Sequence, residues 1–125
     1  MADFAPMSSP SLLVADDHPL FRAAVLHVLH ARFAQYQTLE AASAATVSSM
    51  LQAHPEVELV LLDLTMPGAR GFSTLLHVRG EYSEVPVVII SSNDHPRVIR
   101  RAQQFGAAGF IPKSASAEEI AQAIE

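Results

Sequence analysis

The feature that most constrains the fold is an unbroken apolar run at residues 59–62, which is followed by Asp63 and the turn Pro67-Gly68. A continuous apolar run is typical of a strand covered on both faces, as in a parallel sheet packed between helices. Ligands of such sheets bind beyond the carboxyl ends of the strands, and Asp63 stands at one of these ends. Taken alone, Asp63 is equally compatible with a residue that caps the following turn or helix.

Strand and helix patterns alternate five times along the chain. We expect strands at residues 11–15, 37–41, 59–62, 87–90 and 109–113. We expect helices from Pro19 to about Phe33, from a cap at Ser43 to His54, around Phe72 to Arg79, from Asp94 to Gly106 and from a capping box at Ser116. The third helix is defined by Phe72, Leu75, Leu76 and Arg79, and we expect it to be shorter than the others.

This alternation predicts an α/β fold in which helices cover both faces of a parallel five-stranded sheet. Right-handed crossovers leave few strand orders, and the flavodoxin-like order 2-1-3-4-5 is a common one. The expected architecture is therefore a (βα)5 three-layer sandwich. In that order the strand carrying Asp63 lies at the centre of the sheet.

Length, charge and composition narrow the class of protein. A chain of 125 residues suits one domain, which we place at residues 11–125, after a flexible tail at residues 1–10. The chain has no cysteine, hence no disulfide and no thiolate metal site, which agrees with a cytoplasmic protein. A net charge of −5 argues against nucleic-acid binding by this segment itself, and its apolar runs are too short to span a membrane. The last helix stops early, so we expect a longer natural chain.

Four strand ends carry polar groups that the predicted sheet brings together. Asp16 and Asp17 end the first strand, Asp63 the third, Ser91 the fourth and Lys113 the fifth. Neighbouring strands lie ~4.8 Å apart, so these ends converge on one edge. Three close carboxylates repel one another unless a cation lies among them, and an all-oxygen ligand set favours Mg²⁺. With Lys113 and a dication nearby, Asp63 is equipped to receive a phosphoryl group, to which Ser91 would donate a hydrogen bond.

Each of these residues also has an ordinary structural interpretation. Asp16 and Asp17 would serve equally well as caps of the first helix, and Lys113 as a solvated surface lysine. Ser91 alone would satisfy a local backbone group, and Phe110 alone would belong to the core. Four matching coincidences at four strand ends favour the phosphoacceptor interpretation over this set of unrelated roles.

Two further groups are interpreted as surface features. His27 and His30 share a helical face but lack a third ligand, so we interpret them as a surface pair. A cluster of three arginines on the fourth helix is interpreted as a solvated face, with contact to a partner or a DNA-binding domain left open; these are Arg97, Arg100 and Arg101.

Four segments resemble the conserved blocks of response-regulator receiver domains from two-component systems. They are Val14-Ala15-Asp16-Asp17, Leu61-Leu62-Asp63-Leu64-Thr65-Met66-Pro67-Gly68, Val88-Ile89-Ile90-Ser91-Ser92 and Gly109-Phe110-Ile111-Pro112-Lys113. They occur in the family's order over residues 11–125. The stretches Asp-Asp-His-Pro-Leu-Phe-Arg and Gly-Phe-Ile-Pro-Lys-Ser are similar to those of receivers attached to LuxR-type helix-turn-helix output domains.

The resemblance implies a role for each matching residue. Asp63 is implied as the phosphoacceptor of a sensor histidine kinase, with Lys113 as the partner of its phosphate. Asp17 would bind Mg²⁺ directly, Asp16 through water and Thr65 through its backbone carbonyl. The resemblance also implies the switch pair, Ser91 as the hydroxyl and Phe110 as the aromatic ring that turns inward. It further implies dimerisation on phosphorylation, and DNA binding only through an output domain after Glu125.

The chain departs from the family pattern at some positions. Ser114 follows the lysine where many receivers have a proline, so we expect no cis peptide bond there. Ser92 replaces the usual alanine beside the switch hydroxyl, and Thr65 and Asn93 stand at the positions that tune phosphate lifetime.

Two other functions remain open from the residues. A Mg²⁺-dependent phosphatase of the haloacid-dehalogenase type also forms an aspartyl phosphate, but it carries a general acid two residues after the nucleophile, where this chain has Thr65. A receiver-shaped module could also bind proteins without phosphate. We expect a switch and not an enzyme.

Overall fold

The computed structural model describes residues 10–68 and 71–125, and it confirms the predicted α/β architecture. The tail predicted at residues 1–10 lies, except for Pro10, outside the described residues. The strands are β1 (Ser11–Ala15), β2 (Gln37–Ala41), β3 (Val57–Asp63), β4 (Val87–Ser91) and β5 (Gly109–Pro112). The helices are α1 (Pro19–Arg32), α2 (Ala44–Ala53), α3 (Ser73–Glu81), α4 (Pro96–Gln104) and α5 (Ala117–Ile124).

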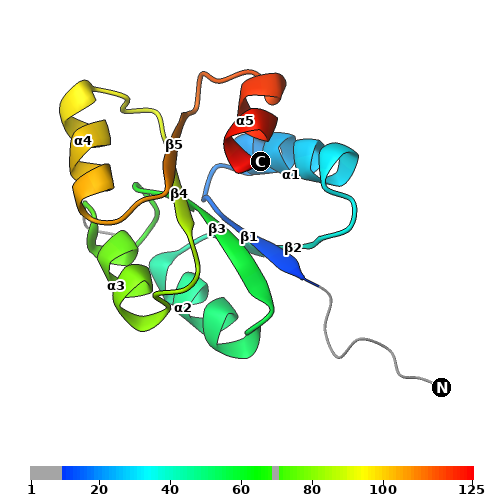
Figure 1. Ribbon diagram of the computed structural model, residues 1–125, viewed down its shortest axis with the longest axis horizontal. Helices are drawn as coiled ribbons and strands as arrows, with labels where there is room; N and C mark the ends of the chain where they lie inside the picture. Colours follow the sequence, from blue (N-terminus) through cyan, green and yellow to red (C-terminus); the bar gives the residue numbers. More distant parts are fainter. Residues whose placement is uncertain (1–9, 69–70) are drawn as a thin grey trace.

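The five strands form one parallel sheet in the order β2-β1-β3-β4-β5, as the alternation predicted. Helices α2, α3 and α4 cover one face and α1 and α5 the other (Figure 1). β3 is therefore buried on both faces, which is why its apolar run does not alternate. None of the helices in the described part of the chain is long and apolar enough to cross a membrane.

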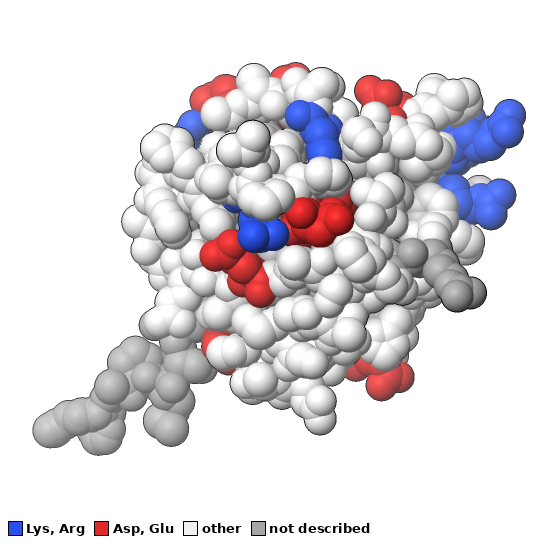
Figure 2. Space-filling view, turned by 180° about the vertical axis from the view of Figure 1, so that it is seen from behind, with Lys and Arg blue, Asp and Glu red and all other residues white. Residues whose placement is uncertain are grey.

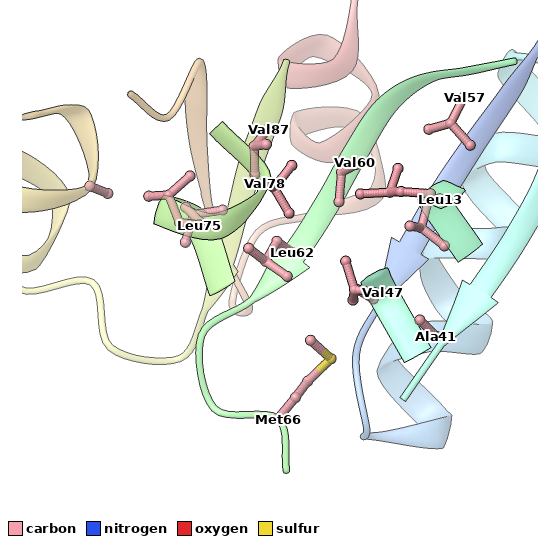
Figure 3. Packing of buried hydrophobic residues seen from close by; sticks show 14 residues of the cluster. Leu13, Ala41, Val47, Val57, Val60, Leu62, Met66, Leu75, Val78 and Val87 are labelled. Atoms are coloured by element: carbon pink, nitrogen blue, oxygen red, sulfur yellow. The ribbon is translucent and has the colours of Figure 1, made fainter. Parts of the chain in front are cut away.

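The core is divided by the sheet into two clusters. Leu62 of β3 packs with Val47 of α2 and Val78 of α3 on one side (Figure 3). Leu61, one residue earlier, packs with Leu29 of α1 on the other side. Because successive strand residues point to opposite faces, β3 contributes to both clusters at once. The carboxyl end of β3 is thereby held between the two layers.

Local signals set most helix boundaries. α1 has Pro19 in its first turn, where a backbone N–H, which proline lacks, would have no hydrogen-bond partner within the helix. The Ser43 side chain caps α2 by accepting a hydrogen bond from the Thr46 amide at 3.2 Å. Ser116 and Glu119 form the predicted reciprocal capping box of α5. Gly106 follows α4 with a φ of 99°, a conformation that other residues rarely adopt.

The structure adds detail to two of the predicted helices. α4 begins at Pro96, and His95 caps it, because the His95 ring accepts a hydrogen bond from the Arg97 amide at 3.1 Å. In α3 the inward residues are Thr74, Leu75 and Val78, whereas Leu76 is 47% exposed. Adjacent helical residues point about 100° apart, so Leu75 and Leu76 cannot both face the sheet.

Candidate functional site

The carboxylates predicted to converge lie together at the carboxyl edge of the sheet. β1 and β3 pair with Ala15 opposite Leu62, so the next residues, Asp16 and Asp63, end neighbouring strands. Both are almost completely buried, with exposed fractions of 0% and 1%. Asp16, Asp17, His18 and Asp63 each offer a ligand atom, and these four atoms all lie within 4.8 Å of one another. Acidic and basic side chains meet near the middle of the face drawn in Figure 2.

Lys113 reaches this cluster from the end of β5. Its backbone amide donates to the Ser91 carbonyl at 2.9 Å, which fixes the start of the side chain beside β4. Its Nζ then lies 3.1 Å from Asp63 Oδ2 and 3.1 Å from Asp16 Oδ2. The ammonium also lies 5.2 Å from the centre of the Phe21 ring, close enough for a cation–π contact. Lys113 thus compensates part of the charge of the buried carboxylates.

Both oxygens of Asp63 have partners. Oδ1 accepts hydrogen bonds from the Thr65 amide at 3.1 Å and the Thr65 hydroxyl at 3.0 Å, and Oδ2 accepts one from Lys113 at 3.1 Å. Burial opposes ionisation, but the Thr65 amide and the Lys113 ammonium outweigh it, so the pKa of Asp63 lies below its ordinary value. Asp63 is therefore a carboxylate at neutral pH despite its burial.

The two predicted switch residues lie on the neighbouring strands. Ser91 ends β4 with an exposed fraction of 1%, and its Oγ accepts a hydrogen bond from the Asn93 amide at 3.0 Å. Phe110 pairs with Ile89 in the sheet and packs, partly buried, against the core cluster beneath α2, α3 and α4. Ser91 is thus engaged with its own loop, and Phe110 retains some solvent exposure.

The donor set suits a hard cation. Asp16 Oδ2 and Asp17 Oδ1 are buried and accept no hydrogen bond from the described residues, although Lys113 Nζ is near Asp16 Oδ2 at 3.1 Å. A buried charged oxygen without a hydrogen bond is costly, and a cation at this point would satisfy both oxygens. Carboxylate oxygens in a shallow loop site are the ligands that Mg²⁺ takes while keeping several waters.

Sequence reasoning missed one residue of the cluster. His18 Nδ1 lies 3.0 Å from Asp16 Oδ1, 3.4 Å from Asp17 Oδ1 and 3.5 Å from Asp63 Oδ2. The signal was present, because His18 directly follows the acidic pair, but it lies in no recognised metal spacing. Its backbone amide donates to Asp16 Oδ1 at 2.8 Å, so His18 contacts this carboxylate through both its main chain and its ring.

The remaining candidates lie elsewhere on the surface. His27 and His30 are both exposed, and the His30 ring lies 3.2 Å from the Thr38 hydroxyl, as suits a surface pair. The three arginines of α4 are exposed too, and Arg101 lies over the Phe105 ring at 5.8 Å. The described part of the chain contains no cis peptide bond, in agreement with the expectation for Ser114.

Comparison with known proteins finds consistent similarities. A family model described as the response regulator receiver domain matches residues 12–125. A Glycerol metabolism activator of Pseudomonas putida is 40% identical over 114 residues, which cover 91% of this chain and 52% of that protein.

Two solved structures are also similar. The receiver domain of the putative response regulator NarL from Mycobacterium tuberculosis has a TM-score of 0.79 at 34% identity, with 93% of each chain covered. A LuxR-family two-component response regulator from Aurantimonas sp. SI85-9A1 has a TM-score of 0.82 at 27% identity, over 94% of this chain and 83% of that one. The chain spans about half the length of the curated relatives it matches.

Proposed function

The chain belongs to the response regulator receiver domains of two-component systems, and on that premise we propose that Asp63 is the phosphoacceptor of a phosphorylation-controlled switch. The observation that carries the proposal is the state of this side chain. Asp63 is buried yet held ionised, and it adjoins two carboxylates that have oxygens without hydrogen bonds. A buried nucleophile beside compensating charge is the arrangement that phosphoryl transfer requires.

In the proposed reaction a carboxylate oxygen of Asp63 attacks the phosphorus of a phosphohistidine on a sensor histidine kinase. The P–O bond forms as the P–N bond breaks, and the histidine nitrogen keeps the electron pair. Lys113, already 3.1 Å from Asp63 Oδ2, is placed to pair with the transferred phosphoryl oxygens. Positioning and charge neutralisation account for most of the catalysis in such transfers.

The site also fits Mg²⁺. Asp17, Asp63 and the backbone carbonyl of Thr65 would hold the ion directly, and Asp16 would hold it through water. When bound, the ion supplies positive charge against the oxygens of the phosphoryl group. The buried oxygens of Asp16 and Asp17 that lack a hydrogen bond support this assignment.

Phosphorylation then changes the balance of charge at the strand ends. The new dianion attracts the Lys113 ammonium and the Ser91 hydroxyl. Ser91 therefore gives up the hydrogen bond that its Oγ accepts from the Asn93 amide in the unphosphorylated protein. The loop after β4 closes, and Phe110 turns into the vacated space. A bistable element biased by a few kcal/mol is sufficient for such a switch.

The signal would pass to a transcriptional output. We place the receiver at residues 11–125 of a longer cytoplasmic protein that binds DNA through a separate domain and dimerises on phosphorylation. The similarity to the LuxR-family regulator from Aurantimonas supports this part of the proposal. The acidic site and the net charge of −5 suit a regulatory half and not a DNA-binding half.

We propose a switch in preference to a phosphatase because of the residue two positions after Asp63. Thr65 stands there, and both its amide and its hydroxyl donate to Asp63 Oδ1. A hydroxyl in this position offers no acid of suitable pKa to protonate a leaving group, so turnover of phosphomonoesters should be poor. A purely phosphate-independent binding module would have no use for the buried carboxylates.

The test is incubation of the protein with acetyl phosphate and MgCl2, followed by intact-mass measurement. We expect one phosphoryl group on the wild type and none on Asp63→Asn. The matched control is Asp94→Asn, which alters an exposed aspartate and should accept phosphate normally. Unchanged mass of the wild type, or phosphate on Asp63→Asn, would overturn the proposal. Sustained hydrolysis of a phosphomonoester would favour the phosphatase.

A further inference from the structure

Arg22 of α1 lies beside the proposed site, and none of the roles implied for the matching residues includes it. Its Nη1 donates a hydrogen bond to the main-chain carbonyl of Asp16, and its Nε donates one to Glu40 Oε1 at 2.8 Å. The Arg22 side chain is 22% exposed, so it lies mostly against the protein and not in solvent. One side chain thus joins α1, the edge strand β2 and the loop after β1.

The carbonyl that Arg22 binds belongs to the peptide unit between Asp16 and Asp17. A peptide unit is planar, so holding its oxygen also restricts the Cα atoms at its two ends. Those two Cα atoms carry the carboxylates whose buried oxygens lack a hydrogen bond in the described part of the chain. The other side of Asp16 is held as well, because its amide donates to the Ala41 carbonyl at 2.9 Å. Arg22 is therefore placed to set how the acidic pair is presented.

Glu40 fixes the arginine and balances its charge. It lies in β2 opposite Val14 of β1, two residues before Asp16, so the sheet holds its backbone in place. An unpaired guanidinium beside the acidic pair would repel a metal ion, since it would supply positive charge at the same point. Paired with Glu40, Arg22 adds no net charge there, and its planar fork still binds the carbonyl and the carboxylate at the same time.

The other arginine of α1 makes a different kind of contact. Arg32 lies at the carboxyl end of the helix, and its Nη1 is 3.0 Å from Glu118 Oε2 of α5. These two side chains are 41% and 61% exposed. An exposed ion pair of this kind contributes little, because water and salt screen it. Arg32→Met is therefore a matched control for a change at Arg22.

We propose that Arg22 is a positioning residue, which holds the Asp16 carbonyl and so presents the Asp16 and Asp17 carboxylates to the cation used in phosphoryl transfer. The inference rests on the proposed function, because it concerns how the same site is held. Loss of a group that orients metal ligands typically weakens metal binding about 10- to 100-fold. A purely electrostatic effect of Arg22 has the opposite sign, because removing a positive charge would tighten the binding of a cation.

The first measurement is Mg²⁺ binding by isothermal titration calorimetry. We expect the dissociation constant to rise at least about tenfold in Arg22→Met and to change less than about twofold in Arg32→Met. Arg22→Lys should lie between Arg22→Met and the wild type, because an ammonium can donate to the carbonyl but lacks the fork that also reaches Glu40. Glu40→Gln, which leaves the arginine without its ion pair, should weaken binding in the same direction.

The second measurement uses the metal-free protein and detects positioning itself. Relaxation of ¹⁵N should give the Asp17 amide an order parameter near the rigid value of about 0.85 in the wild type and in Arg32→Met. In Arg22→Met the value should fall towards about 0.6, because the peptide unit has lost its anchor. A residue that only stabilised the fold would lower the melting temperature and leave this amide unchanged.

The outcomes separate this inference from the function on which it rests. Unchanged or tighter Mg²⁺ binding in Arg22→Met, or an unchanged order parameter of the Asp17 amide, would overturn the inference. If Arg22→Met does not fold, the same two results in Glu40→Gln decide it. Phosphate uptake by Asp63 is measured separately by intact mass, so a wild type that takes no phosphate counts against the proposed function and not against the role of Arg22.

Discussion

Replacing Lys113 by methionine keeps most of the side-chain volume but removes the ammonium that lies 3.1 Å from two buried carboxylate oxygens. Removing one partner of a buried ion pair typically costs about 3–5 kcal/mol, because the remaining charge is left uncompensated. The Lys113 side chain is 14% exposed, so water reaches the ion pair. We therefore expect a loss in the free energy of unfolding at the lower end of this range, about 3 kcal/mol. Against a total stability of about 5–15 kcal/mol for such a domain, that loss is large.

The assay is urea unfolding followed by circular dichroism, without divalent ions and then with Mg²⁺ in excess. At a hundredfold excess over its dissociation constant, an ion that binds only the folded state adds about 2.7 kcal/mol. We therefore expect Mg²⁺ to recover most of the stability that Lys113→Met loses. The matched control is Arg97→Met, which removes an exposed cation of α4 and should change the free energy of unfolding by less than about 0.5 kcal/mol.

The pH dependence of the loss follows from the charge of Asp63. In the wild type its pKa is lowered, so its contribution to stability is present above the unfolded pKa and is lost as the pH falls through the folded pKa. Without Lys113, its hydrogen bond and its charge no longer lower this pKa, so the pKa of Asp63 is higher in the variant than in the wild type and the variant loses less stability than the wild type on acidification. The difference between the two proteins should shrink accordingly. A loss below about 1 kcal/mol without divalent ions, as for an exposed pair, would refute the reasoning.

Three further predictions concern the fold. Leu61→Ala, which truncates a fully buried residue of β3, should cost about 2–5 kcal/mol in urea unfolding, whereas Leu76→Ala at a 47% exposed site should cost less than about 0.5 kcal/mol. Gly106→Ala should lower the melting temperature, because φ at this position is 99° and the new Cβ would lie 3.0 Å from the Arg79 side chain. Its control is Gly80→Ala, whose new Cβ meets no atom within 4 Å and which should stabilise α3 by about 0.5–1 kcal/mol. Glu119→Ala should destabilise α5 near neutral pH but not in acid. Hydrogen bonds from Ser116, which caps the helix, lower the pKa of Glu119, so the stability that Glu119 contributes is lost as the pH falls through this pKa. Acid titration of both proteins, monitored by circular dichroism, measures the difference.

The arrangement of strand ends was predictable because it depends on backbone periodicity. The apolar run before Asp63 indicated a strand buried on both faces, and the order of the strands placed Asp16 and Asp63 on neighbouring ends. Ser43 and Ser116 were predicted as helix caps for the same local reason, since a hydroxyl at that point satisfies a free amide. A helix cap can be predicted from the few residues around it.

The sequence was less informative where side chains choose among several partners. Asp94 and Pro96 marked the start of α4, but they did not show that the ring of His95 accepts the Arg97 amide. His18 was overlooked because no spacing rule describes an imidazole that turns back over the two residues before it. The direction taken by Lys113 was likewise only an expectation, since a four-carbon side chain has many rotamers until the packed structure selects one.

Helix α4 differs from its neighbours in how little it buries. Ala102 is its single fully buried residue, whereas α1 buries Val25, Val28 and Leu29. The transfer free energy of a methyl group is far below that of three branched side chains, so α4 gains less from its fully buried residues than α1 does. A rigid-body displacement of α4 would therefore expose less of the fully buried core than the same displacement of α1.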